Sequence, residues 1–408
     1  MLYGCIGETL KHSFSAQIHP LLTNHPYELR EIERDSLEHF IQEKDFLGIN
    51  VTIPYKEMVI PYLDEIDENA KKIGAINTIV NRNGKLYGYN TDFYGMNMLF
   101  AHAGVDPYKK KAAILGNGGT AKTAMAVLES LGADEIITVS RSGNINYDDL
   151  YNNYSNIDII VNTTPVGMFP NIFDKIVDVN RFDNLSGVID AVYNPLNTTI
   201  VSKAKQKGIP AESGLYMLVG QAIHASELFI GIKYPSYMTD VIYEGIYSEK
   251  ENIVLIGMPS SGKSTVGKVL AQKLGARFVD TDDVITDRIK MPIAEYFALY
   301  GEEEFRRIES EVIRDLAGEN GLVIATGGGA ILKEENVFNL KYNGKILFID
   351  RPLELLIPTD SRPLSNDRRA LENLYNKRYP IYCNVCDACI KASGTPIEIA
   401  ENILENSL

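Results

Sequence analysis

A glycine-rich loop in the second half of the chain constrains the fold more than any other stretch. Residues 257–265 read Gly-Met-Pro-Ser-Ser-Gly-Lys-Ser-Thr and fit the phosphate-loop pattern G-x-x-x-x-G-K-S/T without a mismatch. The apolar run 253–256 before the loop predicts a buried parallel strand, and residues 266–274 after it predict a helix. Such a strand, loop and helix direct backbone N–H groups and the positive end of the helix dipole at one point. The loop therefore predicts binding of a nucleoside triphosphate.

The residue types within the loop fit the chemistry of a nucleotide. Lys263 adds positive charge for the β- and γ-phosphates, and the Ser264 hydroxyl is a ligand for Mg²⁺. The residues expected to contact the nucleotide are Ser260, Ser261, Gly262, Lys263, Ser264 and Thr265. A chance glycine-rich turn is the alternative interpretation, and the flanking strand and helix patterns argue against it.

Composition places the chain among globular proteins and excludes several classes of function. Its 408 residues suggest two or three domains, and 45% hydrophobic with 23% charged residues is an ordinary balance. The formal net charge of -14 argues against a general nucleic-acid or anionic-membrane binder. No apolar run reaches the ~18 residues of a membrane span, and the N-terminus shows no signal peptide. We therefore expect a cytoplasmic protein whose partners are small molecules.

The cysteines predict neither a disulfide framework nor a metal site. Four cysteines are too few for such a framework in a chain of this length. Cys383, Cys386 and Cys389 recur at every third position, but a metal site needs a fourth ligand, and no other His or Cys lies nearby in sequence. We expect these three to be small buried or half-buried thiols.

Short apolar runs alternate with helical patterns along the chain, which predicts an α/β fold. The strand candidates are residues 112–115, 135–139, 157–162, 187–190, 253–256, 322–325, 345–349 and 388–390. A polar stretch at residues 247–252 precedes the phosphate-loop strand and is the natural boundary between an N-terminal and a C-terminal part. Because this stretch is short, we expect the two parts to be joined closely.

The N-terminal part contains a second glycine-rich turn, which is typical of a dinucleotide site. The turn follows a strand candidate and precedes a helical pattern. Its residues are Gly116, Asn117, Gly118, Gly119 and Thr120. About 20 residues on, Arg141 and Ser142 follow the next strand, where a cation accommodates the 2′-phosphate of NADP. A plain tight turn and a solvated surface arginine remain the alternatives.

Blocks of sequence over residues 1 to about 246 resemble shikimate dehydrogenase in their order and spacing. The blocks are residues 11–20, 48–56, 74–78, 88–95, 162–168, 190–195 and 214–222. The resemblance implies a substrate-binding domain from residues 1–98 plus 214–246. It also implies a Rossmann-like NADP-binding domain at residues 99–213.

This resemblance implies a catalytic pair and a set of substrate ligands. Lys56 would exchange a proton with the substrate oxygen, and Asp92 would orient Lys56 and bind a hydroxyl. The other substrate ligands implied are Ser13, Ser15, Thr52, Asn77, Tyr193 and Gln221. Ala191 and Gly214 match positions that line the nicotinamide. The family often carries a second arginine after Arg141, and its absence here weakens the preference for NADP over NAD.

Residues 251–408 resemble shikimate kinase through further blocks in a fixed order. These blocks are the phosphate loop and residues 278–282, 301–309, 326–330, 362–364 and 378–382. By this resemblance Asp280 holds Mg²⁺ with Ser264, and Asp282 is the base or orienter for the hydroxyl that is phosphorylated. Arg306 and Arg378 would clamp the substrate carboxylate beside the backbone of Gly328. Arg362 would reach the ATP phosphates from a lid.

Several of these residues also have ordinary structural interpretations. Asp280 or Asp282 suits a helix cap, and Arg306 suits an i,i+3 ion pair with Glu303 or Glu309. Two other functions compete with the expected pair: enzymes that act on quinate or another hydroxy acid, and a catalytically dead nucleotide-binding regulator. We expect a bifunctional enzyme that reduces 3-dehydroshikimate with NADPH and phosphorylates shikimate with ATP and Mg²⁺.

Overall fold

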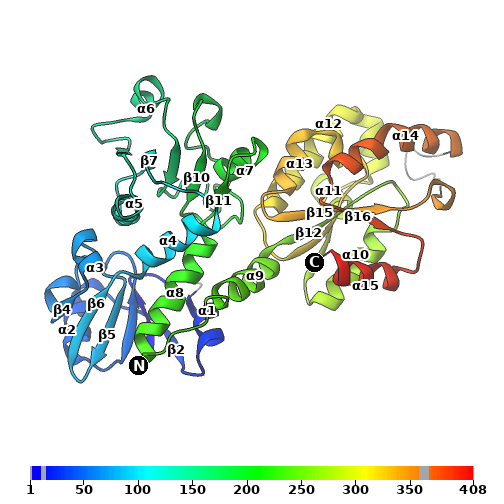
Figure 1. The fold of residues 1–408 in the computed structure, drawn as a ribbon. Helices are drawn as coiled ribbons and strands as arrows, with labels where there is room; N and C mark the ends of the chain where they lie inside the picture. The colour runs from blue at the N-terminus through cyan, green and yellow to red at the C-terminus, as the bar shows by residue number, and fades with distance from the viewer. Residues whose placement is uncertain (1, 11–14, 358–366, 408) are drawn as a thin grey trace. The chain divides into compact units, whose positions relative to one another are not determined.

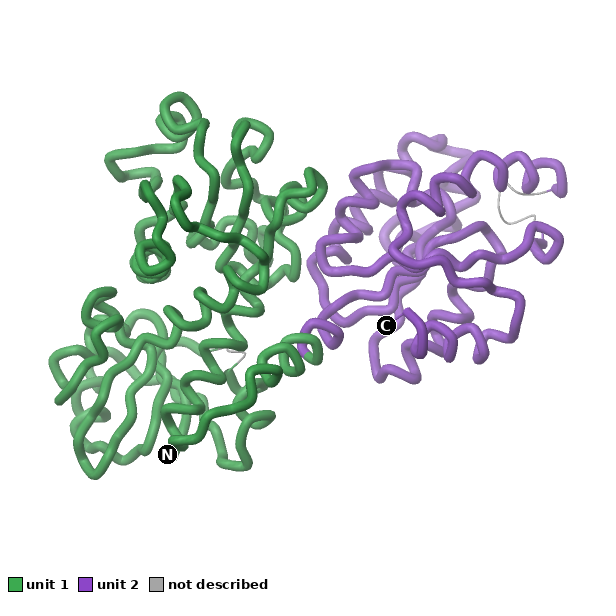
Figure 2. The backbone as a smooth tube through the Cα atoms, viewed as in Figure 1, with its two compact units in different colours: residues 1–245 green, residues 246–408 purple. Residues whose placement is uncertain are grey.

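A computed structural model describes residues 2–10, 15–357 and 367–407 of the chain. The chain divides into two compact units, residues 1–245 and 246–408, which Figure 2 colours separately. Each unit has its own sheets and its own hydrophobic core.

The first sheet of the N-terminal unit is mixed and has the strand order β2-β1-β3-β5-β6-β4. Figure 1 labels its strands β2, β4, β5 and β6. Its strands are β1 (Tyr3–Gly7), β2 (Tyr27–Glu31), β3 (Gly48–Val51), β4 (Glu65–Ile66), β5 (Thr78–Arg82) and β6 (Lys85–Tyr89). Helices α1 (Ser15–Leu22), α2 (Leu37–Glu43) and α3 (Glu68–Ile73) accompany it. Strand β1 pairs in parallel with β2 and β3, whereas β5 pairs antiparallel with β3 and β6.

The second sheet of this unit is fully parallel and has the order β11-β10-β9-β7-β8. Its strands are β7 (Lys111–Leu115), β8 (Glu135–Val139), β9 (Ile159–Asn162), β10 (Gly187–Asp190) and β11 (Ala211–Glu212). Its helices are α5 (Gly119–Ser130), α6 (Tyr147–Asn153) and α7 (Thr199–Gln206). The strand order reverses at β7, so the crevice beyond its carboxyl end is where such sheets bind dinucleotides.

Two long helices connect the sheets of the N-terminal unit. Helices α4 (Thr91–His102) and α8 (Leu215–Ile230) pack closely, because a Cβ atom on Gly95 would lie 2.4 Å from the Met217 carbonyl oxygen. The domain boundary expected after residue 98 falls inside α4. Helix α9 (Met238–Lys250) then runs directly to the next strand, so the polar stretch expected to form the junction is largely helical.

The C-terminal unit is built on a parallel sheet with the order β13-β14-β12-β15-β16. Its strands are β12 (Asn252–Ile256), β13 (Arg277–Asp280), β14 (Leu322–Ala325), β15 (Gly344–Asp350) and β16 (Ala388–Lys391). Its helices are α10 (Lys263–Leu274), α11 (Thr281–Ile289), α12 (Ile293–Ala317), α13 (Glu334–Leu340), α14 (Arg368–Val385) and α15 (Pro396–Asn406). Helix α12 breaks at Gly301, where φ is 83°.

The burial of β12 explains why its sequence is continuously apolar. Val254 and Ile256 belong to the core on one face of the sheet, and Ile253 and Leu255 belong to the core on the other face. Because both faces are covered, no position of this strand is left to solvent. The same alternation places Ala112 and Ala113 of β7 in different cores. The predicted α/β class is confirmed.

The expectation for the cysteines is partly wrong. Cys383 and Cys389 are exposed, and only Cys386 is half-buried. Cys389 lies on β16, which is an edge strand of the sheet. No further strand covers the outer side of an edge strand. Within the described residues, no group of three or more His, Cys, Asp or Glu side chains could hold a metal ion.

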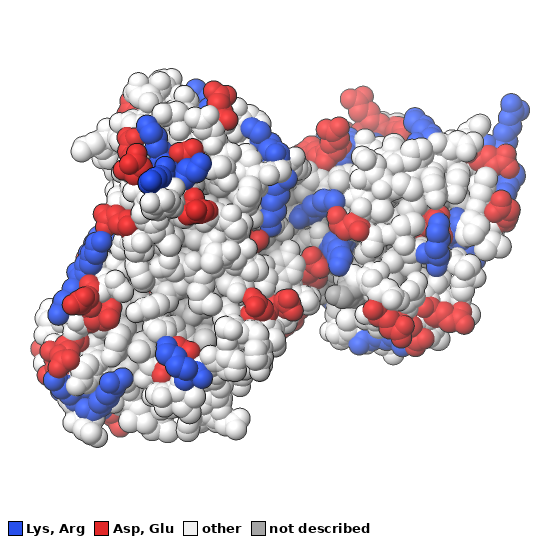
Figure 3. Space-filling view, in the orientation of Figure 1, with Lys and Arg blue, Asp and Glu red and all other residues white. Residues whose placement is uncertain are grey.

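The length of the helices and the distribution of charged side chains complete the description of the fold. None of the described helices is both long and apolar enough to cross a membrane. On the face shown in Figure 3, lysine and arginine side chains are interspersed with aspartate and glutamate, and no large patch of one sign forms.

Two candidate active sites

A cavity of about 810 Å³ lies in the N-terminal unit and is lined from both of its sheets. The predicted residues that line it are Ser15, Thr52, Lys56, Asn77, Asp92, Thr120, Ala191, Tyr193, Gly214 and Gln221. The structure thus brings the expected substrate ligands and part of the expected cofactor loop to one place. Ser13 lies outside the described residues.

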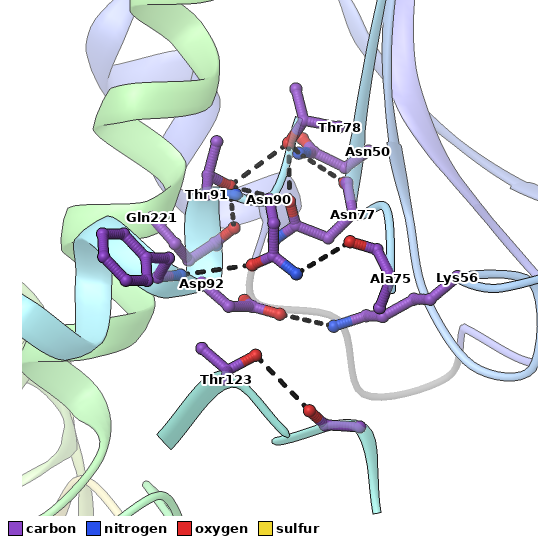
Figure 4. A network of polar contacts seen from close by, with 12 residues as sticks. Asn50, Lys56, Ala75, Asn77, Thr78, Asn90, Thr91, Asp92, Thr123 and Gln221 are labelled. Atoms are coloured by element: carbon purple, nitrogen blue, oxygen red, sulfur yellow. Dashed lines mark hydrogen bonds and ion pairs between the residues drawn. The ribbon is translucent and has the colours of Figure 1, made fainter. Parts of the chain in front are cut away.

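Lys56 and Asp92 form an ion pair in this cavity. The Lys56 Nζ atom donates to Asp92 Oδ2 at 2.6 Å (Figure 4). Asp92 lies in the first turn of α4, where Asn90 caps the helix by accepting from the Phe93 N–H. The helix dipole favours a carboxylate there. The side chains are 26% and 17% exposed, so both groups are held in place yet accessible to a ligand.

A buried hydrogen-bond network lies beside the Lys56–Asp92 ion pair. Asn77 Oδ1 accepts from the Thr91 N–H at 2.7 Å, and Thr91 Oγ1 donates to Gln221 Oε1 at 3.4 Å. Thr78 Oγ1 donates to Asn77 Oδ1 at 3.1 Å and accepts from Asn50 Nδ2 at 3.0 Å. These bonds fix the amide orientations of Asn77 and Gln221 (Figure 4).

Asn50 is a lining residue that the sequence reasoning did not select. It lies on β3, lines the cavity and accepts from the Tyr27 hydroxyl at 2.7 Å. Its only sequence signal is that it is a polar residue within a short apolar strand. A buried amide of this kind needs partners, and the network supplies them.

The expected dinucleotide loop has the backbone that such a site requires. Gly116 has φ +114°, and a Cβ atom there would lie 2.7 Å from Thr163 Oγ1. Among the described residues, only atoms of adjacent residues and of the α5 backbone can lie within 4 Å of the corresponding position on Gly118 or Gly119, where α5 begins. A helix N-terminus with an open glycine approach fits a pyrophosphate.

The remaining cofactor candidates lie around the same crevice. A Cβ atom on Gly214 would lie 2.3 Å from the Ala191 carbonyl oxygen, so only glycine fits beside this wall of the cavity. Arg141 and Ser142 are exposed and follow β8, and Asn117 is exposed in the loop. The exposed guanidinium of Arg141 is thus available to a phosphate at the strand end.

A second cavity, of about 550 Å³, lies at the carboxyl edge of the sheet in the C-terminal unit. The predicted residues that line it are Ser260, Gly262, Lys263, Ser264, Thr265, Asp280, Asp282, Arg306, Gly328 and Arg378. Ser261 as a whole is 1% exposed and does not line the cavity. Arg362 lies outside the described residues.

The phosphate loop folds around its lysine. Lys263 Nζ donates to the carbonyl oxygens of Gly257 at 3.0 Å and Met258 at 2.9 Å, which directs its charge over the loop. Ser264 Oγ donates to Asp280 Oδ2 at 2.6 Å. Asp280 also caps α11, because its Oδ1 accepts from the Asp282 N–H at 3.0 Å. Asp280 therefore caps the helix and also lies beside Ser264, as both interpretations predict.

The oxygen pair of Ser264 and Asp280 fits Mg²⁺ bound beside phosphates. Mg²⁺ usually takes one or two carboxylates from the protein, with substrate phosphates and water as the other ligands. One hydroxyl and one carboxylate at the end of the phosphate loop match that donor set. A cage of protein ligands is not needed for such a site.

Two arginines lie at the far end of this cavity, against the loop 327–329. Arg306 Nη1 donates to Glu309 Oε2 at 2.7 Å, and a Cβ atom on Gly329 would lie 2.3 Å from Arg306 Nη2. Arg378 is 4% exposed, and burial lowers its pKa. Two cations on one cavity wall favour a carboxylate ligand.

Glu309 is another polar lining residue that sequence reasoning did not assign to the site. Its side chain is 1% exposed, and burial raises its pKa, while the charge of Arg306 opposes this rise. The i,i+3 spacing predicts a structural ion pair with Arg306, and the structure forms that pair inside the cavity. Arg306 is thus both paired and exposed to the cavity, so the two interpretations do not compete.

Comparison with known proteins identifies the first unit. Residues 5–79 match the family model described as the shikimate dehydrogenase substrate binding domain. A shikimate dehydrogenase (NADP(+)) of Clostridium beijerinckii is 39% identical over 268 residues, and the match covers 61% of this chain and 98% of the relative. The chain belongs to the shikimate dehydrogenase family.

Solved structures agree with this assignment. A chorismate mutase/shikimate 5-dehydrogenase fusion protein from Clostridium acetobutylicum has a TM-score of 0.58 and 34% identity, covering 60% of this chain and 96% of that one. A shikimate 5-dehydrogenase from Thermus thermophilus, in complex with NADP(H) and shikimate, has a TM-score of 0.54 and 26% identity, covering 60% and 99%.

The second unit matches a different family. Residues 259–407 match the family model described as shikimate kinase. The chain is therefore a fusion of a shikimate dehydrogenase and a shikimate kinase domain. Its two activities are those of these two enzymes, both of the shikimate pathway and hence of aromatic amino acid biosynthesis.

Proposed function

We propose that the chain catalyses two consecutive reactions on one small molecule. The N-terminal unit reduces 3-dehydroshikimate to shikimate with NADPH. The C-terminal unit transfers the γ-phosphoryl group of ATP to the 3-hydroxyl of shikimate, with Mg²⁺. The observation that carries the proposal concerns the residues that the sequence predicts to bind or act on the substrate. In each unit, all of these residues that the structure describes line one cavity.

In the first cavity, Lys56 is the proton donor and Asp92 is its orienting partner. NADPH supplies the hydride that adds to the ketone carbon. As negative charge develops on the ketone oxygen, the Lys56 ammonium transfers a proton to it. The 2.6 Å bond to Asp92 Oδ2 aims the ammonium, and Asp92 also accepts from a substrate hydroxyl. Shikimate leaves with the proton, and Lys56 regains one from water.

The polar groups around this pair position the substrate. Thr52, Asn77, Tyr193 and Gln221 present hydroxyl and amide groups to the same cavity as Lys56. A ligand with one carboxylate and several hydroxyls needs such fixed partners, since each hydroxyl loses water on binding. Thr120 and Ala191 also line this cavity, and beside them we propose the cofactor site.

In the second cavity, charge neutralisation and positioning carry the reaction. ATP supplies the phosphoryl group. Lys263 lies over the phosphate loop, and Ser264 with Asp280 would hold Mg²⁺ beside the phosphates. Asp282 accepts the proton of the attacking hydroxyl, while Arg306 and Arg378 bind the carboxylate at the far wall. The Arg–carboxylate contact keeps the hydroxyl in line with the phosphorus.

The test is a coupled assay with product identification. We expect the chain to convert 3-dehydroshikimate, NADPH and ATP into shikimate 3-phosphate, and to lose the kinase step when a chelator removes Mg²⁺. Lys56→Ala should lower the reduction at least about 100-fold, and Asp282→Ala the phosphorylation by a similar factor. In each variant the activity of the other unit should be unchanged, which controls for the amount of intact chain in the assay.

Specific outcomes contradict individual parts of the proposal. Near-normal reduction by Lys56→Ala would remove Lys56 from the chemistry. Near-normal phosphorylation by Asp282→Ala would do the same for Asp282. A higher rate with NADH than with NADPH would contradict the role of Arg141 as the 2′-phosphate partner.

A further inference from the structure

Arg351 lies against the phosphate loop although it is distant from the loop in sequence. It directly follows β15, which pairs in parallel with β12, so both strands end at the same edge of the sheet. The Ile349 carbonyl oxygen lies 2.8 Å from the Cβ position of Gly257, the first residue of the loop. Ser260 Oγ of the loop donates to the Ile357 carbonyl oxygen at 2.8 Å. The backbone around Arg351 is therefore held to the loop on both sides.

The guanidinium of Arg351 points over the open side of the loop. Its Nη1 atom lies 3.7 Å from the Cβ position of Gly262, and no other described atom lies within 4 Å of that position apart from those of Gly262 and of the residues next to it in the chain. Gly262 lines the cavity and immediately precedes α10, where φ is +96°. The space beside Gly262 is where the loop N–H groups and the helix dipole would meet a phosphate. Arg351 thus places a cation at the edge of that space.

Within the described part of the chain, Arg351 lacks the ion-pair and hydrogen-bond partners that other arginines of this unit have. Its Nε atom is buried and has no hydrogen-bond partner among the described residues, and no described ion pair includes Arg351. By contrast, Arg306 pairs with Glu309, and Arg368 pairs with Glu372 and donates to the Leu356 carbonyl. A buried donor without a partner is unfavourable, and an anionic ligand would satisfy it.

We infer that Arg351 is a further nucleotide-binding residue of the kinase, which donates to phosphate oxygens of ATP next to Gly262. The inference rests on the proposed kinase function. Arginine suits this role because its planar fork donates to two phosphate oxygens at once and remains charged at all relevant pH values. The phosphate-loop pattern cannot reveal the residue, because the strand β15 brings it to the loop.

The direct test measures nucleotide binding rather than activity. In Arg351→Ala, calorimetric titration with ADP and Mg²⁺ should show an affinity about 10-fold lower, because one charged hydrogen-bonding pair is lost. The KM for ATP should rise by a similar factor, whereas the KM for shikimate and the rate of 3-dehydroshikimate reduction should not change. Arg351→Lys should recover only part of the affinity, since lysine lacks the fork.

A matched variant and a simpler anion sharpen the test. Arg277→Ala removes an exposed arginine at the amino end of β13, at the opposite edge of the same sheet, and should leave ADP affinity unchanged. Inorganic tripolyphosphate, used as a competitor of ATP, should lose affinity for Arg351→Ala by the same factor as ADP. An unchanged tripolyphosphate affinity would place the contact on the nucleoside and overturn the phosphate assignment.

The outcomes separate this inference from the proposed function. If the affinity of Arg351→Ala for ADP is within about twofold of the affinity of the original chain, the inference is overturned, whatever the kinase activity of the variant. Equal losses in Arg351→Ala and Arg277→Ala also overturn it, because they would indicate a general weakening of the unit. If the chain does not phosphorylate shikimate but Arg351→Ala still loses ADP affinity selectively, the proposed function fails and the inference stands.

Discussion

Tyr382 illustrates how a residue outside the cavity can decide what the cavity binds. Its side chain is fully buried, and its hydroxyl donates to the Gly328 carbonyl oxygen at 2.6 Å. Arg378, one of the two arginines that would hold the substrate carboxylate, has its Nη1 atom 3.4 Å from the Cβ position of the same Gly328. Burial raises the pKa of Tyr382 to about 12, so the hydroxyl keeps its proton at neutral pH and stays a donor. A single hydroxyl therefore holds the backbone of Gly328, which lies beside the arginine.

We expect Tyr382→Phe to weaken shikimate binding without changing nucleotide binding. The change removes one donor and leaves Gly328, which lies beside the Arg378 guanidinium, without this bond. The KM for shikimate in phosphorylation should rise about 5- to 10-fold, corresponding to roughly 1 kcal/mol for a lost hydrogen bond. The KM for ATP should stay the same. Steady-state kinetics with each substrate varied in turn measure both values.

The control for this prediction lies on the same helix. Tyr375 is half-buried on α14 and stacks on Tyr379, and its hydroxyl forms no hydrogen bond with the described residues. Tyr375→Phe should therefore leave both KM values unchanged. Equal effects of the two substitutions would show that Tyr382 acts through the packing of α14 and not through Gly328 and Arg378.

Single residues also show where sequence reasoning stops. Lys263, Ser264 and Asp280 could be proposed because their types recur at fixed spacing around a strand and a helix. Asn50 and Glu309 could not, because each acquires its place through a partner distant along the chain or through burial that a sequence does not display. An amide or a carboxylate is informative only once its surroundings are known.

At the scale of elements, strands are more predictable than helix ends. The runs at 135–139, 187–190 and 322–325 coincide with β8, β10 and β14, because apolar residues fill both faces of a covered parallel sheet. The polar stretch at 247–252 predicts a junction, yet α9 continues through Lys250 and β12 begins at Asn252. Polar residues suit an exposed helix end as well as a loop, so composition alone does not separate the two.

The end of β10 combines a buried carboxyl group with a place beside the active site. Asp190 is fully buried there, and its carboxylate accepts from the Val192 N–H, Asn162 Nδ2 and Thr198 Oγ1. Burial nevertheless raises the pKa of Asp190 to about 6. The folded state therefore holds this proton more tightly than the unfolded chain, in which the pKa of an aspartate is about 3.9.

We expect this group to make the N-terminal unit less stable as the pH rises from about 4 to about 6. Below the pKa of the unfolded chain, the carboxyl group is neutral in both the folded and the unfolded state. Above the pKa of the folded state it is charged in both states, and burial of the charge then lowers the free energy of unfolding. The free energy of unfolding should fall by about 3 kcal/mol over this window relative to Asp190→Asn, which does not titrate. Urea unfolding of both proteins between pH 4 and pH 7 measures the difference.

An exposed aspartate provides the comparison. Asp183 is exposed in the same unit. The free energy of unfolding of Asp183→Asn should therefore depend on pH in the same way as that of the original chain. If the difference between the original chain and Asp190→Asn stays constant from pH 4 to pH 7, the pKa of Asp190 is not raised and the three hydrogen bonds outweigh burial. If that difference changes in the opposite direction, the pKa is lowered.

At the scale of the whole molecule, one compound is expected to bind in both units. Shikimate is the product of the first proposed reaction and the substrate of the second. The two units have separate hydrophobic cores, so each can unfold in its own transition. A ligand stabilises only the unit that binds it, by RT ln(1 + [L]/Kd). Thermal unfolding can therefore report on the two sites independently in the intact chain.

We expect shikimate to raise both unfolding transitions, and each cofactor to raise only one. At about 100 times its Kd a ligand adds about 2.7 kcal/mol, which corresponds to roughly 5 to 10 °C for a unit of this size. NADP⁺ should raise only the transition of residues 1–245, and ADP with Mg²⁺ only that of residues 246–408. Asn77→Ala should abolish the response of the first transition to shikimate, and Arg378→Ala that of the second. Differential scanning calorimetry of the three proteins measures these shifts, and a response of only one transition to shikimate in the original chain would contradict a shared ligand.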